Sequence, residues 1–452
     1  MKYLLAALTS MTLGAQAATI AIIDSGVDTE HVDLVNKLWI NPGEKADNGR
    51  DEDRNGYQDD VFGWNFAENN NLVIDRKYIG TFSEDPFTFF DIQGRQFLGN
   101  ETPEDIAWLQ EKRKDKNFIK EMGIFGNFVH GTHVAGIAAK DNDKAKLLSV
   151  KLIPTEVKPF AKNEKSNPQM PNVEAMPKSI RMKLLKASLT KLAEQQMLQL
   201  EEIAYYVGQH KSDVANGSFG TGFPQALKIV PTIFKIFFLR APTKEETIEV
   251  SKFFINTLIK QGKKMVEAAP KTLFVFAAGN DGLNNDIYPT SPTNIQADNV
   301  ISVAATYKYN FIAPFSNYGT KMVDVAAPGM LINSQIPGDE YLPVSGTSQA
   351  APYVANVAAQ IKDMNKNLTP KQIKKILMGT VDSKDWLTAK VKTGGIVNMN
   401  RAVEAAKLTH AMSVEEAIAE SLVNVKDVVV KKNKSRNFAR RVMPMPMPSM
   451  FR

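Results

Sequence analysis

The sequence predicts an α/β fold with a mostly parallel central sheet and helices on both faces. Short apolar, β-branched runs have the pattern of buried parallel strands, and stretches with helical periodicity separate them. Strands that alternate with helices in this way are typical of a parallel sheet. The predicted strands cover residues 18–26, 146–152, 272–278 and 299–305. In such sheets, functional residues collect at the carboxyl ends of the strands.

The helices follow from apolar periodicity and from the polar residues that precede them. A small-residue stretch at Gly131–Ala139 is expected to open a helix directly after His130. Three further stretches have a helical pattern, namely Ile180–Val207, Thr243–Ala268 and Ser348–Asp363. Because these stretches lie between or after the predicted strands, they are expected to cover the two faces of the sheet.

Three surface insertions are expected to enlarge this fold, at about residues 81–123, 154–211 and 221–250. The first ends in a highly charged run that is typical of a solvated helix face. The second starts as a loop rich in Pro, Asn and Lys and continues into an amphipathic helix. The third contains the apolar run LKIVPTIFKIFFL, which is interpreted as a lid or a surface patch.

Composition excludes several classes of protein. The chain has 452 residues and no cysteine, so disulfides, Cys-ligated metals and a thiol nucleophile are excluded. The net charge is +6, but eight basic residues and one acid lie between Val425 and Arg452, which leaves the rest of the chain close to neutral. A body that binds nucleic acid is therefore not expected. The basic tail, residues 411–452, is expected to be flexible, with an unknown partner.

The N-terminus has the pattern of an export signal over residues 1–17. Lys2 precedes an apolar stretch, and Ala15-Gln16-Ala17 is an A-x-A cleavage site. A membrane anchor is the competing interpretation, because residues 3–23 are nearly free of charge. The export signal is preferred to the anchor, because residues 18–23 have the pattern of a buried strand and not of a membrane span. The sequence thus predicts a secreted or periplasmic protein with no stable membrane insertion.

Three short motifs carry the chemistry. Asp24 ends the first strand, His130 precedes a small-residue helix, and Ser348 lies on a Gly-containing turn that opens another helix. A hydroxyl nucleophile needs an imidazole as base and a carboxylate that holds the tautomer of that imidazole. Each motif alone could be a turn cap or a structural residue. Together they occur in one of the orders known for a Ser-His-Asp triad.

With these motifs the sequence resembles the subtilisin-like serine proteases, or subtilases. The resemblance covers most of the chain apart from the insertions and the tail, and implies a subtilisin-like three-layer fold for a single catalytic domain over residues 18–410. It implies that Asp24 orients the imidazole, that His130 is the general base and that Ser348 is the nucleophile. His133 corresponds to a second, structural histidine, and Asn280 to the asparagine that stabilises the oxyanion.

The resemblance also implies the walls of the substrate-binding cleft. The stretch Asp213–Gly220 resembles the family's substrate-binding strand, along which an extended peptide would pair. The small and uncharged walls favour a bulky apolar side chain before the cleaved bond. The predicted substrate-binding residues are Ser218, Phe219, Gly220, Ala277, Ala278 and Gly279.

A second constellation, DEDRNGYQDD at residues 51–60, predicts a structural calcium site. Oxygen ligands at alternate positions, a Gly at the sixth and a backbone carbonyl at the seventh describe a Ca²⁺ loop. Phe62 stands where an EF-hand has its bidentate Glu, so Asp59 or Asp60 would have to compensate. The alternative is a solvated acidic turn. The predicted ligands are Asp51, Asp53, Asn55, Tyr57, Asp59 and Asp60.

These patterns predict a secreted serine endopeptidase that acts on protein or peptide substrates through an acyl-enzyme intermediate. Two alternatives remain, a latent or non-catalytic subtilase-like binding protein with a blocked cleft, and an ester hydrolase. No N-terminal propeptide of the family's usual length is expected between the export signal and the first strand. Either the protein folds unaided, or an inserted segment or the C-terminal tail takes part of the propeptide's role in folding and inhibition.

Overall fold

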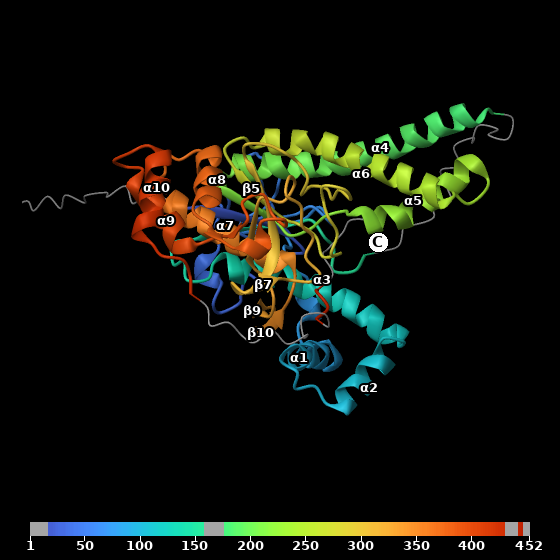
Figure 1. Cartoon of the computed structure of the whole chain (residues 1–452), viewed down its shortest axis with the longest axis horizontal. Helices are drawn as coiled ribbons and strands as arrows, with labels where there is room; N and C mark the ends of the chain where they lie inside the picture. Colours follow the sequence, from blue (N-terminus) through green and yellow to red (C-terminus); the bar gives the residue numbers. More distant parts are fainter. Residues whose placement is uncertain (1–16, 158–175, 430–441, 446–452) are drawn as a thin grey trace, which may run out of the picture.

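The computed structural model describes residues 17–157, 176–429 and 442–445 (Figure 1). Its centre is a 10-stranded sheet in the order β11-β12-β8-β6-β5-β4-β1-β3-β2, with β7 paired to β6. Within the described residues, all its strand pairings are parallel except β11–β12 and β6–β7. The predicted α/β fold with a mostly parallel sheet is therefore confirmed.

The four strands predicted from apolar runs all form. They are β1 (Thr19–Asp24), β3 (Lys146–Lys151), β5 (Leu273–Ala277) and β6 (Val300–Tyr307). The other strands of the sheet are β2 (Gly63–Asn65), β4 (Val214–Gly217), β7 (Phe311–Ile312), β8 (Val325–Pro328), β11 (Asp382–Ser383) and β12 (Gly395–Ile396). A separate antiparallel hairpin consists of β9 (Ile332–Ile336) and β10 (Glu340–Val344).

The sheet separates two apolar cores. Successive side chains of a strand point to opposite faces, and β1 is apolar on both. Ile20 and Ile22 pack in one core with residues of α3 (Lys116–Ala138) and α7 (Thr347–Met364). Ala21 and Ile23 pack in the other core with α4 (Lys178–Gln209), α5 (Phe223–Phe238) and α6 (Lys244–Ala268). Helices thus cover both faces, as the predicted three-layer arrangement requires.

The helix that carries His130 begins earlier than the sequence indicated. We expected a helix opening after His130, but α3 starts at Lys116, with the Asp115 side chain accepting from the backbone N–H groups of Asn117 and Phe118. His130 is therefore in the interior of a 23-residue helix. The N-terminal part of α3 comes from the charged end of the first insertion.

The insertions form helices that project from the central layers. The first contributes α1 (Asp85–Leu98) and α2 (Pro103–Lys112), which lie at the lower edge of the molecule in Figure 1. The second and third contribute α4, α5 and the first residues of α6, and these helices pack together and extend beyond the sheet (Figure 1). The apolar run predicted as a lid or patch is α5, which buries Phe234 and Phe238 against its neighbours. Residues 158–175 of the predicted loop lie outside the described residues.

The C-terminal part of the described chain is helical. It contains α8 (Pro370–Gly379), α9 (Met399–Leu408) and α10 (Val414–Asn424), and α10 lies within the predicted tail. Arg401 of α9 donates to the carbonyl of Val425 and to the carboxylate of Asp427, which holds the chain after α10 against the domain. The predicted export signal lies almost wholly outside the described residues.

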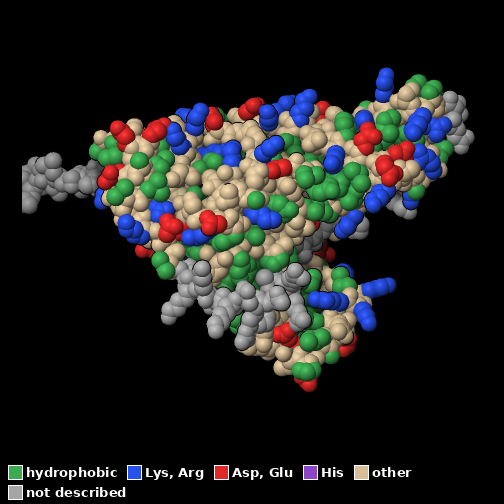
Figure 2. All heavy atoms as spheres, viewed as in Figure 1, with side chains coloured by type: hydrophobic (Ala, Val, Ile, Leu, Met, Phe, Trp, Pro, Cys, Tyr) green, Lys and Arg blue, Asp and Glu red, His purple; other side chains and the backbone are tan. Residues whose placement is uncertain are grey.

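Both signs of charge are mixed over the face seen in Figure 2. Among the described residues, no helix is both long and apolar enough to cross a bilayer.

Candidate active site

Asp24 ends β1, at the carboxyl edge of the sheet, and is fully buried. Its Oδ1 accepts from the backbone N–H of Ser25 at 2.7 Å and contacts Nδ1 of His130 at 2.7 Å. Its second oxygen, Oδ2, is buried and has no hydrogen-bond partner among the described residues. The carboxylate is thus held by its neighbour in the chain and directed at the imidazole.

Close backbone contact fixes the position of His130 on α3. The N–H of Gly131 donates to Oγ of Ser25 at 3.0 Å, which ties the helix to the loop after β1. A Cβ at Gly131 would lie 2.2 Å from the carbonyl oxygen of Gly26, so only glycine allows this approach. With Nδ1 bound to Asp24, the other ring nitrogen, Nε2, is buried without a hydrogen-bond partner in the described part of the chain. A buried and unpaired imidazole nitrogen is available as a base.

Ser348 is the second residue of α7, after the N-cap Gly346, so it lies at the positive end of the helix dipole. Its Oγ donates to the carbonyl of Ser218 at 3.3 Å, and Oγ of Ser218 donates to the carbonyl of Ser348 at 3.0 Å. No hydrogen bond joins Ser348 to His130 within the described residues. The helices that carry the two residues pack together, and Nε2 of Gln349 lies 3.5 Å from Nδ1 of His133.

Asn280 follows β5 and is oriented by the start of α7. Its Oδ1 accepts from the backbone N–H of Thr347 at 2.9 Å and from the Thr347 hydroxyl at 2.8 Å. The amide NH₂ therefore points the other way, where Nδ2 donates to the carbonyl of Met445 at 3.3 Å. Gly279, with a φ of +111°, permits the turn before Asn280, and a Cβ there would lie 2.4 Å from Asn317 Nδ2. The structure thus brings an amide donor to the N-terminus of the serine helix.

The predicted substrate-binding residues lie on two neighbouring strands, because β4 and β5 are paired. Ser218 directly follows β4 and bonds to Ser348, as described above. Phe219 is buried and packs edge-on against Phe276 of β5. Ala277 and Ala278 are fully buried. Phe219 and Gly220 line a small cavity of about 10 Å³ together with Gln196, Met197, Leu200, Thr221, Ser291 and Pro292.

The other histidines of the motifs have structural surroundings. His133 is fully buried, with Nε2 2.9 Å from the carbonyl of Leu342 and 3.1 Å from that of Ile332. Burial lowers the pKa of His133 to about 4, so the ring is neutral at pH 7 and its Nε2–H links α3 to the β9–β10 hairpin. His31 is also buried, and its Nδ1 accepts from the backbone N–H of Asp33.

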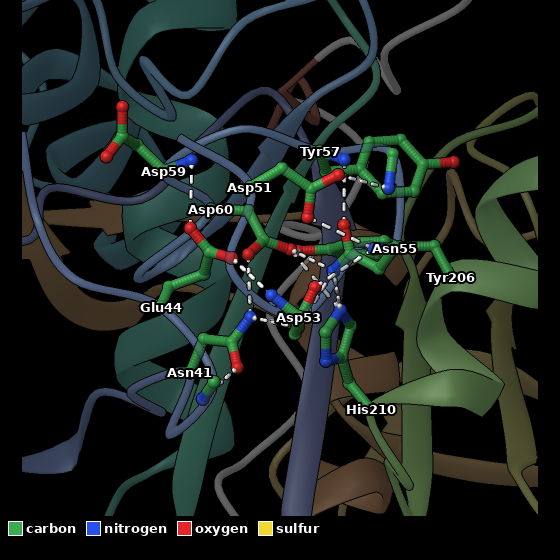
Figure 3. A network of polar contacts seen from close by, with 12 residues as sticks. Asn41, Glu44, Asp51, Asp53, Asn55, Tyr57, Asp59, Asp60, Tyr206 and His210 are labelled. Atoms are coloured by element: carbon green, nitrogen blue, oxygen red, sulfur yellow. Dashed lines mark hydrogen bonds and ion pairs between the residues drawn. The ribbon is translucent and has the colours of Figure 1, made fainter. Parts of the chain in front are cut away.

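The acidic loop brings together three carboxylates, two of them predicted ligands. One oxygen each of Asp51, Asp53 and Glu44 can be chosen so that all lie within 4.8 Å of one another (Figure 3). Glu44 precedes the loop and was not among the predicted ligands. Burial raises the pKa of Glu44, and its oxygens accept from the backbone N–H groups of Glu52, Asp53 and Asp59.

The remaining predicted ligands have other partners (Figure 3). Asp59 accepts from the backbone N–H groups of Asn48 and Gly49. Asp60 is fully buried, and its oxygens accept from the Tyr206 hydroxyl at 2.8 Å and from Asn41 and Asn55. The Tyr57 side chain donates to Glu202, and its backbone N–H donates to Oδ1 of Asn55.

Sequence reasoning missed the residues from the C-terminal end that reach the site. Besides its contact with Asn280, Met445 donates its N–H to the carbonyl of Ser345 at 2.8 Å. Two residues earlier, the N–H of Met443 donates to Oε1 of Gln93 on α1 at 2.7 Å. The signal in the sequence that could have pointed to them is the repeat MPMPMP, which follows a run of basic residues in the tail.

Two proteases are among the relatives that share sequence with this chain. The alkaline protease of Alkalihalobacillus alcalophilus is 30% identical over 254 residues, covering 56% of this chain and 50% of that protein. The extracellular basic protease of Dichelobacter nodosus is 40% identical over 144 residues, 29% of this chain and 23% of that protein. The chain therefore spans half or less of these relatives' length. A crystal structure of a lanthipeptide protease has 16% identity and a TM-score of 0.48, with 86% of this chain and 89% of that one covered.

The family model described as "Subtilase family" matches residues 15–404, which include Asp24, His130, Asn280 and Ser348. Because this match extends over most of the chain, the protein belongs to the subtilase family.

Proposed function

We propose that the protein is a serine endopeptidase that hydrolyses peptide bonds of proteins or peptides through an acyl-enzyme intermediate. The observation that carries the proposal is the contact between Asp24 and His130, 106 residues apart in the chain, which leaves the buried Nε2 unpaired. This is the arrangement that a general base needs, because the carboxylate selects the Nδ1–H tautomer and leaves Nε2 to accept a proton.

In the proposed reaction, Ser348 Oγ leaves the carbonyl of Ser218 and attacks the scissile carbonyl carbon. His130 Nε2 takes the hydroxyl proton, and Asp24 stabilises the imidazolium that forms. The oxyanion accepts from Nδ2 of Asn280 and from the backbone N–H of Ser348. His130 then donates its proton to the leaving amine, and water hydrolyses the acyl-enzyme by the same steps in reverse order.

The substrate would lie along the predicted walls. Ser218, Phe219 and Gly220 would pair with the substrate on one side, and Ala277, Ala278 and Gly279 would form the other side of the primary pocket. Export to the periplasm or the medium is part of the proposal, supported by the A-x-A pattern at Ala15–Ala17 and by the extracellular relative named above.

A structural calcium ion would be held in the acidic loop. Carboxylates of Glu44, Asp51 and Asp53 converge there, and oxygen is the ligand type that calcium prefers. Asn55 and the carbonyl of Tyr57 would complete the set, with Asp59 and Asp60 as the remaining predicted ligands. The bound ion would offset the repulsion among these carboxylates and so stabilise the loop.

The second candidate is a latent subtilase with a blocked cleft. One observation favours it, because the side chains of both Ser348 and His130 are fully buried. A latent enzyme keeps a reactive serine, whereas a non-catalytic binding protein does not need one.

Labelling of the purified protein with a fluorophosphonate tests the proposal, with the Ser348→Ala variant as control. We expect labelling of the wild type and none of Ser348→Ala, with turnover of a peptide substrate following the same pattern. Equal thermal unfolding temperatures of the wild type and Ser348→Ala would show that the variant folds. Peptidase activity retained by folded Ser348→Ala would refute the assignment of the nucleophile.

A further inference from the structure

Residues 442–445 lie against the catalytic residues through contacts of their backbone. The Met445 N–H donates to the carbonyl of Ser345, three residues before Ser348. The Met445 carbonyl accepts from Nδ2 of Asn280. A single residue of the C-terminal segment therefore engages both the turn that leads to the nucleophile and the amide proposed to bind the oxyanion.

The first insertion holds the upstream part of this segment. Oε1 of Gln93, a buried residue of α1, accepts from the Met443 N–H at 2.7 Å. A guanidinium nitrogen of Arg113, the residue after α2, lies 3.6 Å from the Met443 sulfur. The segment thus bridges the insertion and the sheet edge, two parts that are distant in the sequence.

The side chain of Met445 fills an apolar site. It is 1% exposed and belongs to a cluster with Phe90 of α1, Phe125 of α3 and Val344 of β10. Val129 and Val344 of this cluster are the residues immediately before His130 and Ser345. Met445 therefore lies in a single binding site with two parts. The first insertion supplies the aromatic wall of this site, and the region around Asn280 and Ser345 supplies its polar groups.

With Met445 in place, the site has no free position for a substrate carbonyl at Asn280. The amide donor that would stabilise the oxyanion is already bound, and Ser348 and His130 are fully buried. Ser348 Oγ is bonded to Ser218 and not to the segment. The segment occupies the site without presenting a bond for attack.

We propose that residues 442–445 are an intramolecular inhibitor that must leave the cleft before a peptide substrate can bind. The inference rests on the proposed peptidase function. Because the segment belongs to the same chain, its effective concentration at the site can reach the millimolar range, so a few contacts suffice to keep it bound. Release of residues 442–445 then controls access to Ser348 and Asn280.

The test compares full-length wild type with Met445→Asp, which places a charge in the apolar site. Val429→Asp is the matched control, because Val429 also lies in the tail but is 93% exposed. We expect Met445→Asp to react with a fluorophosphonate at least tenfold faster than wild type and to cleave a peptide substrate faster, whereas Val429→Asp should behave as wild type. Hydrogen exchange measures the segment independently, since the N–H groups of Met443 and Met445 should be protected in wild type and exchange freely in Met445→Asp.

Each outcome separates the two proposals. Equal labelling rates in wild type and Met445→Asp, or unprotected amides in wild type, would overturn the inhibitor while leaving the peptidase intact. No labelling of any variant, with the amides still protected in wild type, would refute the peptidase function and with it the inhibition. Faster labelling of Val429→Asp would also overturn the inference, because it would show a general effect of charge in the tail.

Discussion

The proposed catalytic site, which contains the carboxylate of Asp24, and the acidic loop, which contains several carboxylates, are built in different ways. In the cleft, Asp24, His130, Asn280 and Ser348 come from distant parts of the chain and are each held at the end of a strand or on a helix. In the loop, Asp51 and Asp53 lie within one short turn, and most of their partners are neighbouring backbone amides. The first site depends on the whole fold, whereas the second is largely local.

The two regions also differ in what remains unpaired. In the cleft, Oδ2 of Asp24 and Nε2 of His130 are buried without a partner in the described residues. In the loop, both oxygens of Asp59 and both oxygens of Asp60 accept hydrogen bonds. Buried polar groups are normally satisfied. Asp24 and His130 contact each other, and their unpaired atoms therefore fit the proposed chemistry, whereas the satisfied oxygens of Asp59 and Asp60 fit a structural role. The following predictions test this difference, starting with the largest effect.

Asp24→Asn should lower kcat by about 10⁴-fold, because the amide favours the wrong tautomer of His130. The unfolding temperature should change little, since Asn keeps the shape of the side chain. Asp53→Asn in the loop is the matched control and should leave kcat within about twofold of wild type. Steady-state kinetics with a peptide substrate measures both variants, and a large loss of kcat in Asp53→Asn would break the proposed separation of roles.

Stability should fall as the pH is lowered from about 6.5 towards 4, in part through His133. Burial holds its folded-state pKa at about 4, below the ordinary value of 6.5, so the unfolded chain binds the proton first. The contribution of neutral His133 to the free energy of unfolding is fully present above pH 6.5 and is lost as the pH falls from 6.5 to 4. Its size is on the order of 3 kcal/mol. In His133→Gln, whose amide can still donate to the hairpin, chemical denaturation should show a flatter pH dependence over this range. An unchanged slope would contradict the role of His133.

Removal of calcium should lower the unfolding temperature by several degrees with little effect on the geometry of the cleft. At a calcium concentration 100-fold above Kd, bound calcium adds about 2.7 kcal/mol. Asp53→Asn should unfold at a lower temperature in calcium and respond less to a chelator than wild type does. Asp143→Asn, which removes a fully exposed carboxylate outside the loop, should respond like wild type. Thermal denaturation with and without chelator measures the difference, and an equal response of Asp53→Asn and wild type would exclude this ligand.

The candidate catalytic residues could be selected from the sequence because each stands in a short motif tied to a strand end or a helix. The strand that ends at Asp24 could be identified from β-branched residues alone, since both of its faces are buried. The true start of the helix that carries His130 could not be identified from the sequence. Gly126 and Gly131 lie inside α3, and glycine in a helix is unfavourable unless packing compensates. At Gly131 that packing is the close approach of Gly26, a contact that only the fold reveals.

The ligand geometry of the acidic loop and the position of Met445 depend on contacts that no local pattern encodes. Glu44 reaches Asp51 and Asp53 because the chain folds back, while the spacing rule considers only residues within the loop. The apolar cluster around Met445 combines residues of α1, α3 and β10. Its members have ordinary apolar periodicity within their own helices, so nothing in the sequence distinguishes them from a general core.

The length of α3 has a structural consequence. The helix starts beside α2 in the first insertion and runs without interruption to His130, a distance of about 21 Å at 1.5 Å per residue. One unbroken helix therefore connects the first insertion to the residue that contacts Asp24. The present N-cap of this helix, Asp115, belongs to the insertion. A shortened version of this protein without the insertion would need a new N-cap residue before His130 to satisfy the backbone N–H groups at the start of the helix.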